Sequence, residues 1–220
     1  MGMPVLILGE SGSGKTASLR NFLPGEIGIY NVAGKPLPFR TKLPKLDNAT
    51  YAGIFSSLSK KILKRYVIDD SQYLMAFYMF DHANEKGFTK FTQCAIDFKS
   101  LIDFVVRKLP DDTVVYFLHH TELSDDGKLK AKTQGKMLDS QLTLEGLFSI
   151  VLLAETDGKE HWFTTQSNGR TPCKSPMGMF SDRIDNDLKM VDKTIREYYE
   201  MPDPEKEKAN GKEDQPPHQN

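Results

Sequence analysis

An apolar run that leads into a glycine-rich run decides the fold: Met3-Pro4-Val5-Leu6-Ile7-Leu8-Gly9-Glu10-Ser11-Gly12-Ser13-Gly14-Lys15-Thr16. The residues from Val5 to Leu8 are typical of a buried strand. The eight residues that follow match G-x-x-x-x-G-K-[ST] in full, which is the pattern of a P-loop that holds phosphate groups. A helix is predicted from about Lys15 to Phe22, where Pro24-Gly25 ends it. The order strand, loop, helix is the context that this motif requires.

Each position of the motif has a chemical reason. The glycines let the backbone turn tightly, so that successive N–H groups point at phosphate oxygens. The start of the helix adds the positive end of its dipole. Lys15 is expected to reach the β- and γ-phosphates, and the Thr16 hydroxyl to ligate Mg²⁺. We therefore expect ATP with Mg²⁺ as the ligand, and as its binding residues Gly9, Glu10, Ser11, Gly12, Ser13, Gly14, Lys15, Thr16 and Ala17.

A second apolar run, Tyr66-Val67-Ile68, ends in the two acids Asp69 and Asp70. An acid at the end of a buried strand is the usual partner of a P-loop, and Asp69 is expected to hold Mg²⁺ together with Thr16, directly or through water. Asp70 could orient or deprotonate the attacking water. Lys15 and Asp70 are therefore two of the predicted catalytic residues.

The third catalytic candidate comes from the pair His119-His120, which follows the strand predicted at residues 113–118. Gln72 also follows a predicted strand end. In a parallel sheet such carboxyl ends line the ligand crevice, where a polar side chain can sense the γ-phosphate. The prediction names His120 as the catalytic residue, and the residues themselves leave His119 as the alternative.

The rest of the chain alternates strands with helices. Further strands are predicted at 27–32 and 147–154, helices at 50–64, 71–82, 92–109 and 184–200, and residues 161–165 are expected to pair back on the strand before them as a hairpin. Residues 123–137 are polar and are predicted to form a loop. This alternation predicts an α/β fold of one domain over residues 1–200, with a mostly parallel sheet, helices on both faces and a C-terminal β-hairpin. Residues 203–220 are predicted to be a disordered polar tail.

Composition narrows the class of protein. Of the 220 residues 39% are hydrophobic and 27% charged, and the net charge of −1 gives no global field that would attract a polyanion. No run approaches the roughly 20 apolar residues of a membrane span. The two cysteines, Cys94 and Cys173, have neither a disulfide nor a metal-ligand spacing. These features predict a cytoplasmic protein that has no membrane partner.

One group of cations lies in the predicted polar loop: Lys128, Lys130, Lys132 and Lys136. Alternate lysines on a loop could follow the phosphate backbone of single-stranded DNA. Lys136 could instead complete the site of a neighbouring subunit. The alternative is a solvated loop, and Asp125-Asp126 weakens its positive charge.

Several quoted segments together resemble a known group of proteins. They are the P-loop run, Ile29-Tyr30-Asn31-Val32-Ala33-Gly34-Lys35-Pro36-Leu37-Pro38-Phe39, Val67-Ile68-Asp69-Asp70-Ser71-Gln72-Tyr73 and Thr133-Gln134-Gly135-Lys136-Met137-Leu138. The chain resembles, over residues 3–195, the small RecA-like ATP-binding proteins of bacteriophages, which include single-strand annealing recombination ATPases. The resemblance implies a RecA-like P-loop NTPase core, a homo-oligomer, single-stranded DNA and a single-strand binding protein as partners, and location in the host cytoplasm.

The chain departs from that pattern at one point. A RecA core places a water-activating glutamate shortly after its second strand, but no acid occurs here between Glu26 and Asp47. The base must then be Asp70 or another group. Three functions stay open: an ATPase that serves DNA recombination or replication, a non-catalytic nucleotide-gated partner of a single-strand binding protein or helicase, and a small-molecule P-loop kinase.

Overall fold

The computed structural model describes residues 1–135 and 142–204. Its centre is a nine-stranded sheet in the order β3-β2-β4-β5-β1-β7-β8-β9, with β6 paired to β5. The strands are β1 (Met3–Gly9), β2 (Gly28–Asn31), β3 (Lys45–Asp47), β4 (Arg65–Asp69), β5 (Val114–Leu123), β6 (Leu129–Ala131), β7 (Ile150–Thr156), β8 (His161–Thr164) and β9 (Arg183–Asp185). The pairs from β3 to β7 along this order are parallel, and β8 and β9 add antiparallel partners.

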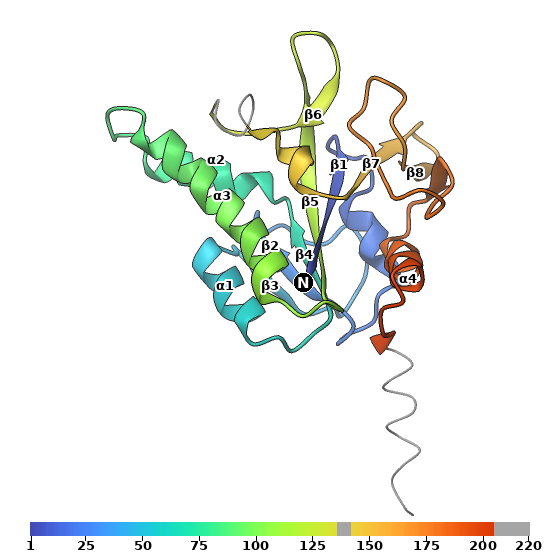
Figure 1. Cartoon of the computed structure of the whole chain (residues 1–220). Helices are drawn as coiled ribbons and strands as arrows, with labels where there is room; N and C mark the ends of the chain where they lie inside the picture. The colour runs from blue at the N-terminus through green and yellow to red at the C-terminus, as the bar shows by residue number, and fades with distance from the viewer. Residues whose placement is uncertain (136–141, 205–220) are drawn as a thin grey trace, which may run out of the picture.

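Helices cover both faces of this sheet (Figure 1). The α-helices are α1 (Tyr51–Ser59), α2 (Gln72–Asp81), α3 (Thr89–Lys108) and α4 (Leu188–Tyr198). Two short 3₁₀ helices, η1 (Thr16–Asn21) and η3 (Leu144–Leu147), lie in the connections. The α/β class and the mostly parallel sheet are confirmed, and β7 and β8 form the expected antiparallel hairpin.

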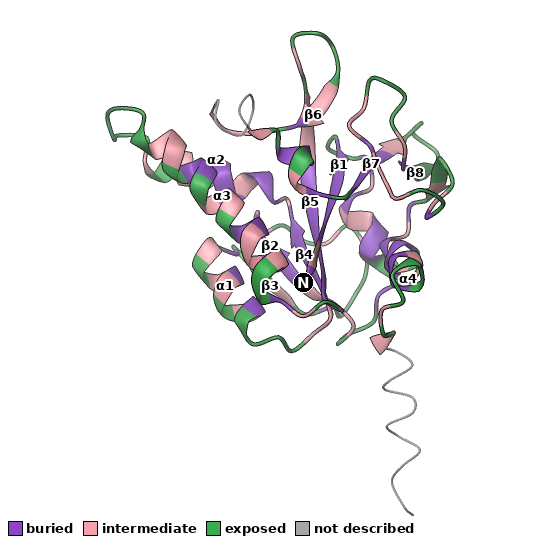
Figure 2. Cartoon of the chain, in the orientation of Figure 1, coloured by how far each residue is buried: buried purple, intermediate pink, exposed green. Residues whose placement is uncertain are grey.

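Alternation along the strands divides the core into two layers. Leu6 and Leu8 of β1 pack with the cluster that includes Phe98 of α3, whereas Val5 and Ile7 face the cluster that includes Ile195 of α4. All four β1 side chains are fully buried. Figure 2 shows the central strands buried and the outer faces of the helices exposed. A strand buried on both faces reads as a continuous apolar run, which is why β1 and β4 could be predicted.

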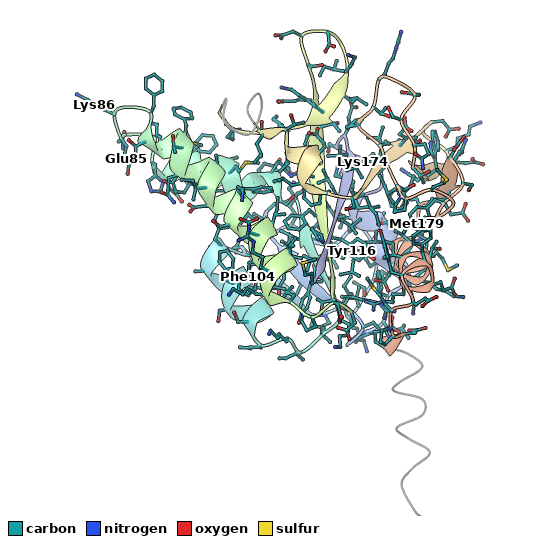
Figure 3. All side chains as sticks on the ribbon, in the orientation of Figure 1. Glu85, Lys86, Phe104, Tyr116, Lys174 and Met179 are labelled. Atoms are coloured by element: carbon teal, nitrogen blue, oxygen red, sulfur yellow. The ribbon has the colours of Figure 1, made fainter. Side chains whose placement is uncertain are left out.

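A buried ionic cluster fixes α4 to the sheet. Asp192, which is 0% exposed, accepts hydrogen bonds from Arg65 Nε at 2.5 Å, Arg196 Nε at 2.7 Å and Tyr116 Oη at 2.8 Å. Figure 3 places Tyr116 in the interior of the molecule, whereas Glu85 and Lys86 lie at the outer tip of the turn between α2 and α3. The carboxylate thus satisfies two buried cations at once, as buried charges require.

Several local predictions are wrong. The loop predicted at 123–137 contains strand residues, because β5 continues to Leu123 and pairs with β6 in a hairpin. That hairpin projects beyond the main sheet (Figure 1), and of β6 the two residues Leu129 and Ala131 pack against the core, a set too short to give a periodic apolar signal. The helix expected from Lys15 to Phe22 is the shorter 3₁₀ helix η1. The short strands β3 and β9 were not predicted at all.

The remaining expectations on the chain concern its cysteines, membrane segments and tail. Cys94 and Cys173 are both buried free thiols. In the described ranges no helix has the length and apolar character that crossing a membrane requires. Most of the predicted tail, residues 205–220, lies outside the described residues.

Candidate functional site

The carboxyl ends of three neighbouring strands meet at one edge of the sheet. Strand β5 lies between β1 and β4, so Gly9 at the end of β1 is opposite His120 of β5, and Asp69 ends β4. A cleft of about 400 Å³ opens at this edge. It is lined by Ser11, Gly12, Gly14, Lys15, Thr16, Ala17, Asn31, Lys35, Pro36, Pro38, Asp69, Asp70, His120 and His161.

The glycine-rich loop curls around the ammonium group of its own lysine, Lys15. Lys15 Nζ donates hydrogen bonds to the carbonyl oxygens of Gly9 at 2.7 Å and Glu10 at 2.8 Å. Lys15 is only 5% exposed, and its burial lowers the pKa to about 8 although Asp70 and Asp69 attract the charge. Gly12 has a φ of +83°, and no heavy atom lies within 4 Å of the position that a Cβ there would take. The loop therefore combines a buried cation with a glycine backbone open to a ligand.

The side chains of Thr16 and Asp69 meet although 53 residues separate them in sequence. Thr16 Oγ1 donates to Asp69 Oδ1 at 2.8 Å. Asp69 is 4% exposed, and burial raises its pKa to about 6. A hydroxyl and a carboxylate at this distance are oxygen ligands of the kind that Mg²⁺ prefers, and Mg²⁺ takes its other ligands from water and phosphate. The pair fits such an ion.

Asp70 holds a second cluster at the same end of the cleft. Its φ is +60°, a left-handed conformation that aspartate tolerates better than most residues. One carboxylate oxygen accepts from Lys35 Nζ at 3.1 Å, and the other lies 3.2 Å from His120 Nε2. Burial alone would raise the pKa of Asp70, but the hydrogen bonds from His120 and Lys35 outweigh it and hold the pKa below its ordinary value.

The two histidines of β5 have different environments. His119 is fully buried, with Nδ1 2.9 Å from Ser71 Oγ and Nε2 donating to the carbonyl of Lys132 at 2.7 Å. Burial lowers the pKa of His119 to about 4, so this ring is neutral at pH 7. His120 lines the cleft instead. Successive strand residues face opposite sides, which separates the two.

The structure brings together only part of the predicted set. Of the nine expected nucleotide-binding residues, Gly9, Glu10 and Ser13 do not line the cleft, although Gly9 and Glu10 hold Lys15. Gln72 is buried and accepts a hydrogen bond from the backbone N–H of His120, so it positions His120 and does not itself line the cleft.

Two of the lysines predicted for DNA or subunit contact, Lys128 and Lys130, lie on the β5–β6 hairpin, and neither lines the cleft. Lys128 pairs with Asp126 at 2.7 Å, and Lys130 with Glu122 at 3.3 Å. Lys132 contributes its carbonyl oxygen to His119. Lys136 lies outside the described residues.

Three polar residues of the cleft were not predicted: Asn31, Lys35 and His161. Asn31 ends β2, and its amide donates to the carbonyl of Lys35 at 2.6 Å, which shapes the segment that carries this lysine. Their position in the sequence could have indicated Asn31 and Lys35 as cleft residues, because Asn31 lies at the end of a predicted parallel strand and Lys35 follows it. His161 begins β8 and approaches from the far side of the P-loop, and nothing in the sequence indicates this.

Comparisons with known proteins give no match, either to a protein-family model or to a curated protein. The chemical argument therefore depends on the cleft. It brings together a buried lysine, a hydroxyl–carboxylate pair and an Asp–His–Lys cluster around a glycine-rich loop. In the described segments no three His, Cys, Asp or Glu side chains gather in a group that could hold a metal ion.

Proposed function

We propose that the protein binds ATP with Mg²⁺ in this cleft and hydrolyses the terminal phosphate. The observation that carries the proposal is the contact of Thr16 Oγ1 with Asp69 Oδ1 at 2.8 Å. A P-loop motif can occur by chance, but a chance match does not bring its hydroxyl to a strand-end carboxylate 53 residues away. The mostly parallel sheet, with β1 near its centre, is compatible with a RecA-like P-loop core, and we propose that assignment for the fold.

The phosphates would be held by the loop from Gly9 to Thr16. Lys15 would exchange the carbonyls of Gly9 and Glu10 for phosphate oxygens, which carry full negative charge and are stronger acceptors. With a pKa of about 8, Lys15 is mostly protonated at pH 7 and can make this exchange as a cation. The backbone N–H groups at the start of η1 add further donors.

Thr16 and Asp69 would hold the magnesium ion, whose role when bound is to neutralise charge on the phosphate oxygens. Asp69 must be ionised to hold the ion. Although burial raises its pKa to about 6, the carboxylate is still mostly charged at pH 7. A nearby cation would favour the ionised form further.

Asp70 and His120 are the candidates for activating water. No acid occurs in the sequence where a RecA core has its glutamate, and neither of the nearest acids on either side lines the cleft: Glu26 pairs with Lys189 at 2.9 Å, and Asp47 accepts from Asn31. His120 Nε2 donates to Asp70, which leaves Nδ1 as the acceptor in a neutral ring. His120 Nδ1 can then take the proton from water, while Asp70 orients the ring and stabilises the charge that forms on it.

Phosphate release and Mg-ATP binding, measured on the wild type, Asp70→Asn and His120→Gln, test this proposal. We expect both variants to bind Mg-ATP within a few-fold of wild type and to lose about 100-fold or more in turnover, the usual share of a general base. Asp126→Asn is the matched control, since Asp126 pairs with Lys128 on the distant hairpin. If the wild type binds Mg-ATP and both variants keep full turnover, Asp70 and His120 do not take part in the reaction.

Single-stranded DNA as a partner, a single-strand binding protein and a homo-oligomer follow from the resemblance in sequence alone. Lys128 and Lys130 each pair with a carboxylate of their own hairpin, so they offer a weaker positive field than the sequence suggests. No specific observation in the cleft favours the two other functions, a nucleotide-gated partner protein or a small-molecule kinase. Of these functions we propose the ATPase.

A further inference from the structure

The cleft has a second lysine, Lys35, which no step of the proposed hydrolysis uses. Lys35 lines the cleft on the segment that follows β2, and its side chain is 62% exposed. Its ammonium nitrogen lies 3.1 Å from Asp70 Oδ2 and 5.2 Å from the centre of the Tyr73 ring. The hydrogen bond to Asp70 raises the pKa of Lys35, so this side chain is a cation at pH 7.

The backbone that carries Lys35 is held in place, whereas its ammonium group is open to the cleft. Asn31 Nδ2 donates to the carbonyl oxygen of Lys35 at 2.6 Å and also to the carboxylate of Asp47. Shortly after Lys35, the side chains of Leu37 and Phe39 pack against the core. Lysine carries its charge on a flexible four-carbon stem, so the charge can change partner while the backbone stays fixed.

The partner of Lys35 can release it without losing its own place. Asp70 Oδ1 lies 3.2 Å from His120 Nε2, so the contact with His120 remains when Lys35 leaves Oδ2. An ion pair that is open to water on the lysine side contributes little stability. A terminal phosphate carries more negative charge than one carboxylate, and it therefore competes well for the ammonium group.

The strand order brings the two lysines of the cleft to the metal pair from opposite sides. Lys15 follows β1 and Lys35 follows β2, and β4 and β5 lie between these two strands. Asp69, the metal ligand proposed above, ends β4 and contacts Thr16. Burial raises the pKa of Asp69, and the charge of Lys35 limits that rise, so Lys35 acts on the group that would hold the metal ion. A terminal phosphate bound at that ion lies in the field of both lysines.

We propose that Lys35 stabilises the charge on the terminal phosphate during hydrolysis and acts on the nucleotide of its own chain, a proposal that rests on the ATPase function proposed above. In that step the water oxygen forms a bond to the γ-phosphorus. The bond to the β–γ bridging oxygen breaks, and its electron pair goes to ADP. The water proton goes to His120 Nδ1, and Lys35 gives up none. A cation placed beforehand at the transferring phosphate stabilises the transition state, and here one chain supplies it without a second copy.

Phosphate release and Mg-ATP affinity of Lys35→Gln and Lys35→Arg test the role of the charge. Lys35→Gln should bind Mg-ATP within a few-fold of wild type and turn over about 100-fold or more slowly. Lys35→Arg keeps the charge and should recover about tenfold or more of that loss. Lys99→Gln is the matched control, since Lys99 forms an ion pair with Asp103 on α3 and does not line the cleft, and it should change neither quantity.

A transition-state mimic separates this role from mere positioning of Asp70. Calorimetry measures the affinity for Mg-ADP with and without aluminium fluoride, which imitates the phosphate in transfer. Wild type should bind Mg-ADP about 100-fold or more tightly with the fluoride. Lys35→Gln should lose most of that gain and keep its affinity for Mg-ADP alone, both in the wild-type background and in Asp70→Asn. If Lys35→Gln causes no further loss in Asp70→Asn, Lys35 acts only through Asp70 and the proposal is overturned.

Co-expression of Lys15→Met with Lys35→Gln tests whether Lys35 acts within one chain. The first variant lacks the lysine that holds the phosphates, and the second lacks the proposed cation. The mixture should release phosphate no faster than the sum of the two variants measured alone. Turnover well above that sum would show that Lys35 of one copy serves the site of another, which contradicts the assignment to its own chain.

The outcomes also separate Lys35 from the proposed function. If the wild type hydrolyses Mg-ATP and Lys35→Gln keeps full turnover, Lys35 takes no part in the reaction and the proposed function stands. If the wild type neither binds nor hydrolyses Mg-ATP, the proposed function is refuted and the role of Lys35 with it.

Discussion

Replacing Lys15 by methionine should leave the stability of the protein nearly unchanged in the absence of nucleotide, although Lys15 is buried in the cleft. Lys15 is 5% exposed, and burial lowers its pKa from 10.5 to about 8. A lowering of that size corresponds to about 3 kcal/mol against the charged form in the folded state. Its two hydrogen bonds to the carbonyls of Gly9 and Glu10 come from a charged donor and offset this by about 1.5 kcal/mol each. Methionine has a similar length and no charge, so we expect the free energy of unfolding to change by no more than about 1 kcal/mol.

Urea unfolding at pH 7 measures this difference. Lys35→Met is the matched control, because the Lys35 side chain lines the same cleft but is 62% exposed, and loss of its ion pair with Asp70 should lower the free energy of unfolding by no more than about 1 kcal/mol. Calorimetry on the same samples should show that Lys15→Met loses Mg-ATP affinity by about tenfold or more, since a hydrogen bond to a charged group is lost. Substitution of this one residue then weakens binding and leaves stability nearly unchanged.

The pH dependence tests the cause. At pH values below about 8 both the folded and the unfolded chain carry the Lys15 proton, so the full destabilisation is present. Between about 8 and 10.5 the unfolded chain still binds the proton and the folded chain releases it, so the wild type gains stability as the pH rises. Wild type should therefore gain stability relative to Lys15→Met over that interval. A variant that is less stable than wild type by more than about 2 kcal/mol at pH 7, or a difference between the two proteins that stays constant up to pH 10.5, would refute the reasoning.

Three further outcomes are expected. Mg-ATP affinity should fall as the pH drops below about 6, because protonation of Asp69 removes the charge of a magnesium ligand, and calorimetry on Asp69→Asn should show that pH step abolished. Asp192→Ala should lower the free energy of unfolding in urea by about 3–5 kcal/mol, since Arg65 and Arg196 lose a shared buried carboxylate, and should leave Mg-ATP affinity intact. ATP turnover should rise with single-stranded DNA, as the resemblance implies; saturating single strands that change neither the rate nor the size of the oligomer would contradict it.

The features that could be predicted from sequence are those whose signal is local. Val5 to Leu8 lies inside β1 because every one of its side chains is buried, and burial on both faces produces an uninterrupted apolar run. The strand before Asp69 follows the same rule. Strands β3 and β9 have three residues each and are mostly exposed, so no period of apolar residues marks them.

The choice between His119 and His120 could not be made from sequence, because it depends on which face of β5 packs against α3. Phe98 of α3 lies against the side of the strand that carries Phe117 and His119, with ring centres 6.2 and 5.7 Å apart. His120, one residue on, is thereby directed at the cleft. The position of α3 is set by tertiary packing, and a shift of β5 by one residue would exchange the buried and the cleft-facing histidine. The position of Asn186 also depends on tertiary packing and could not be predicted, because this residue follows β9 and lies near Gly14 only in the folded chain.

Two buried charges without full compensation lie side by side in the cleft, and that pattern is itself an argument about function. Beside the glycine-rich loop are a desolvated lysine, Lys15, and an aspartate whose pKa burial raises, Asp69. At the far end of the sheet the equally buried Asp192 is fully compensated by two arginines and a tyrosine. The same chain can therefore compensate a buried charge, so the incomplete compensation of Lys15 and Asp69 in one cleft points to a ligand. A polyanion with a divalent cation would compensate both, since it gives Lys15 a counter-charge and Asp69 a cation.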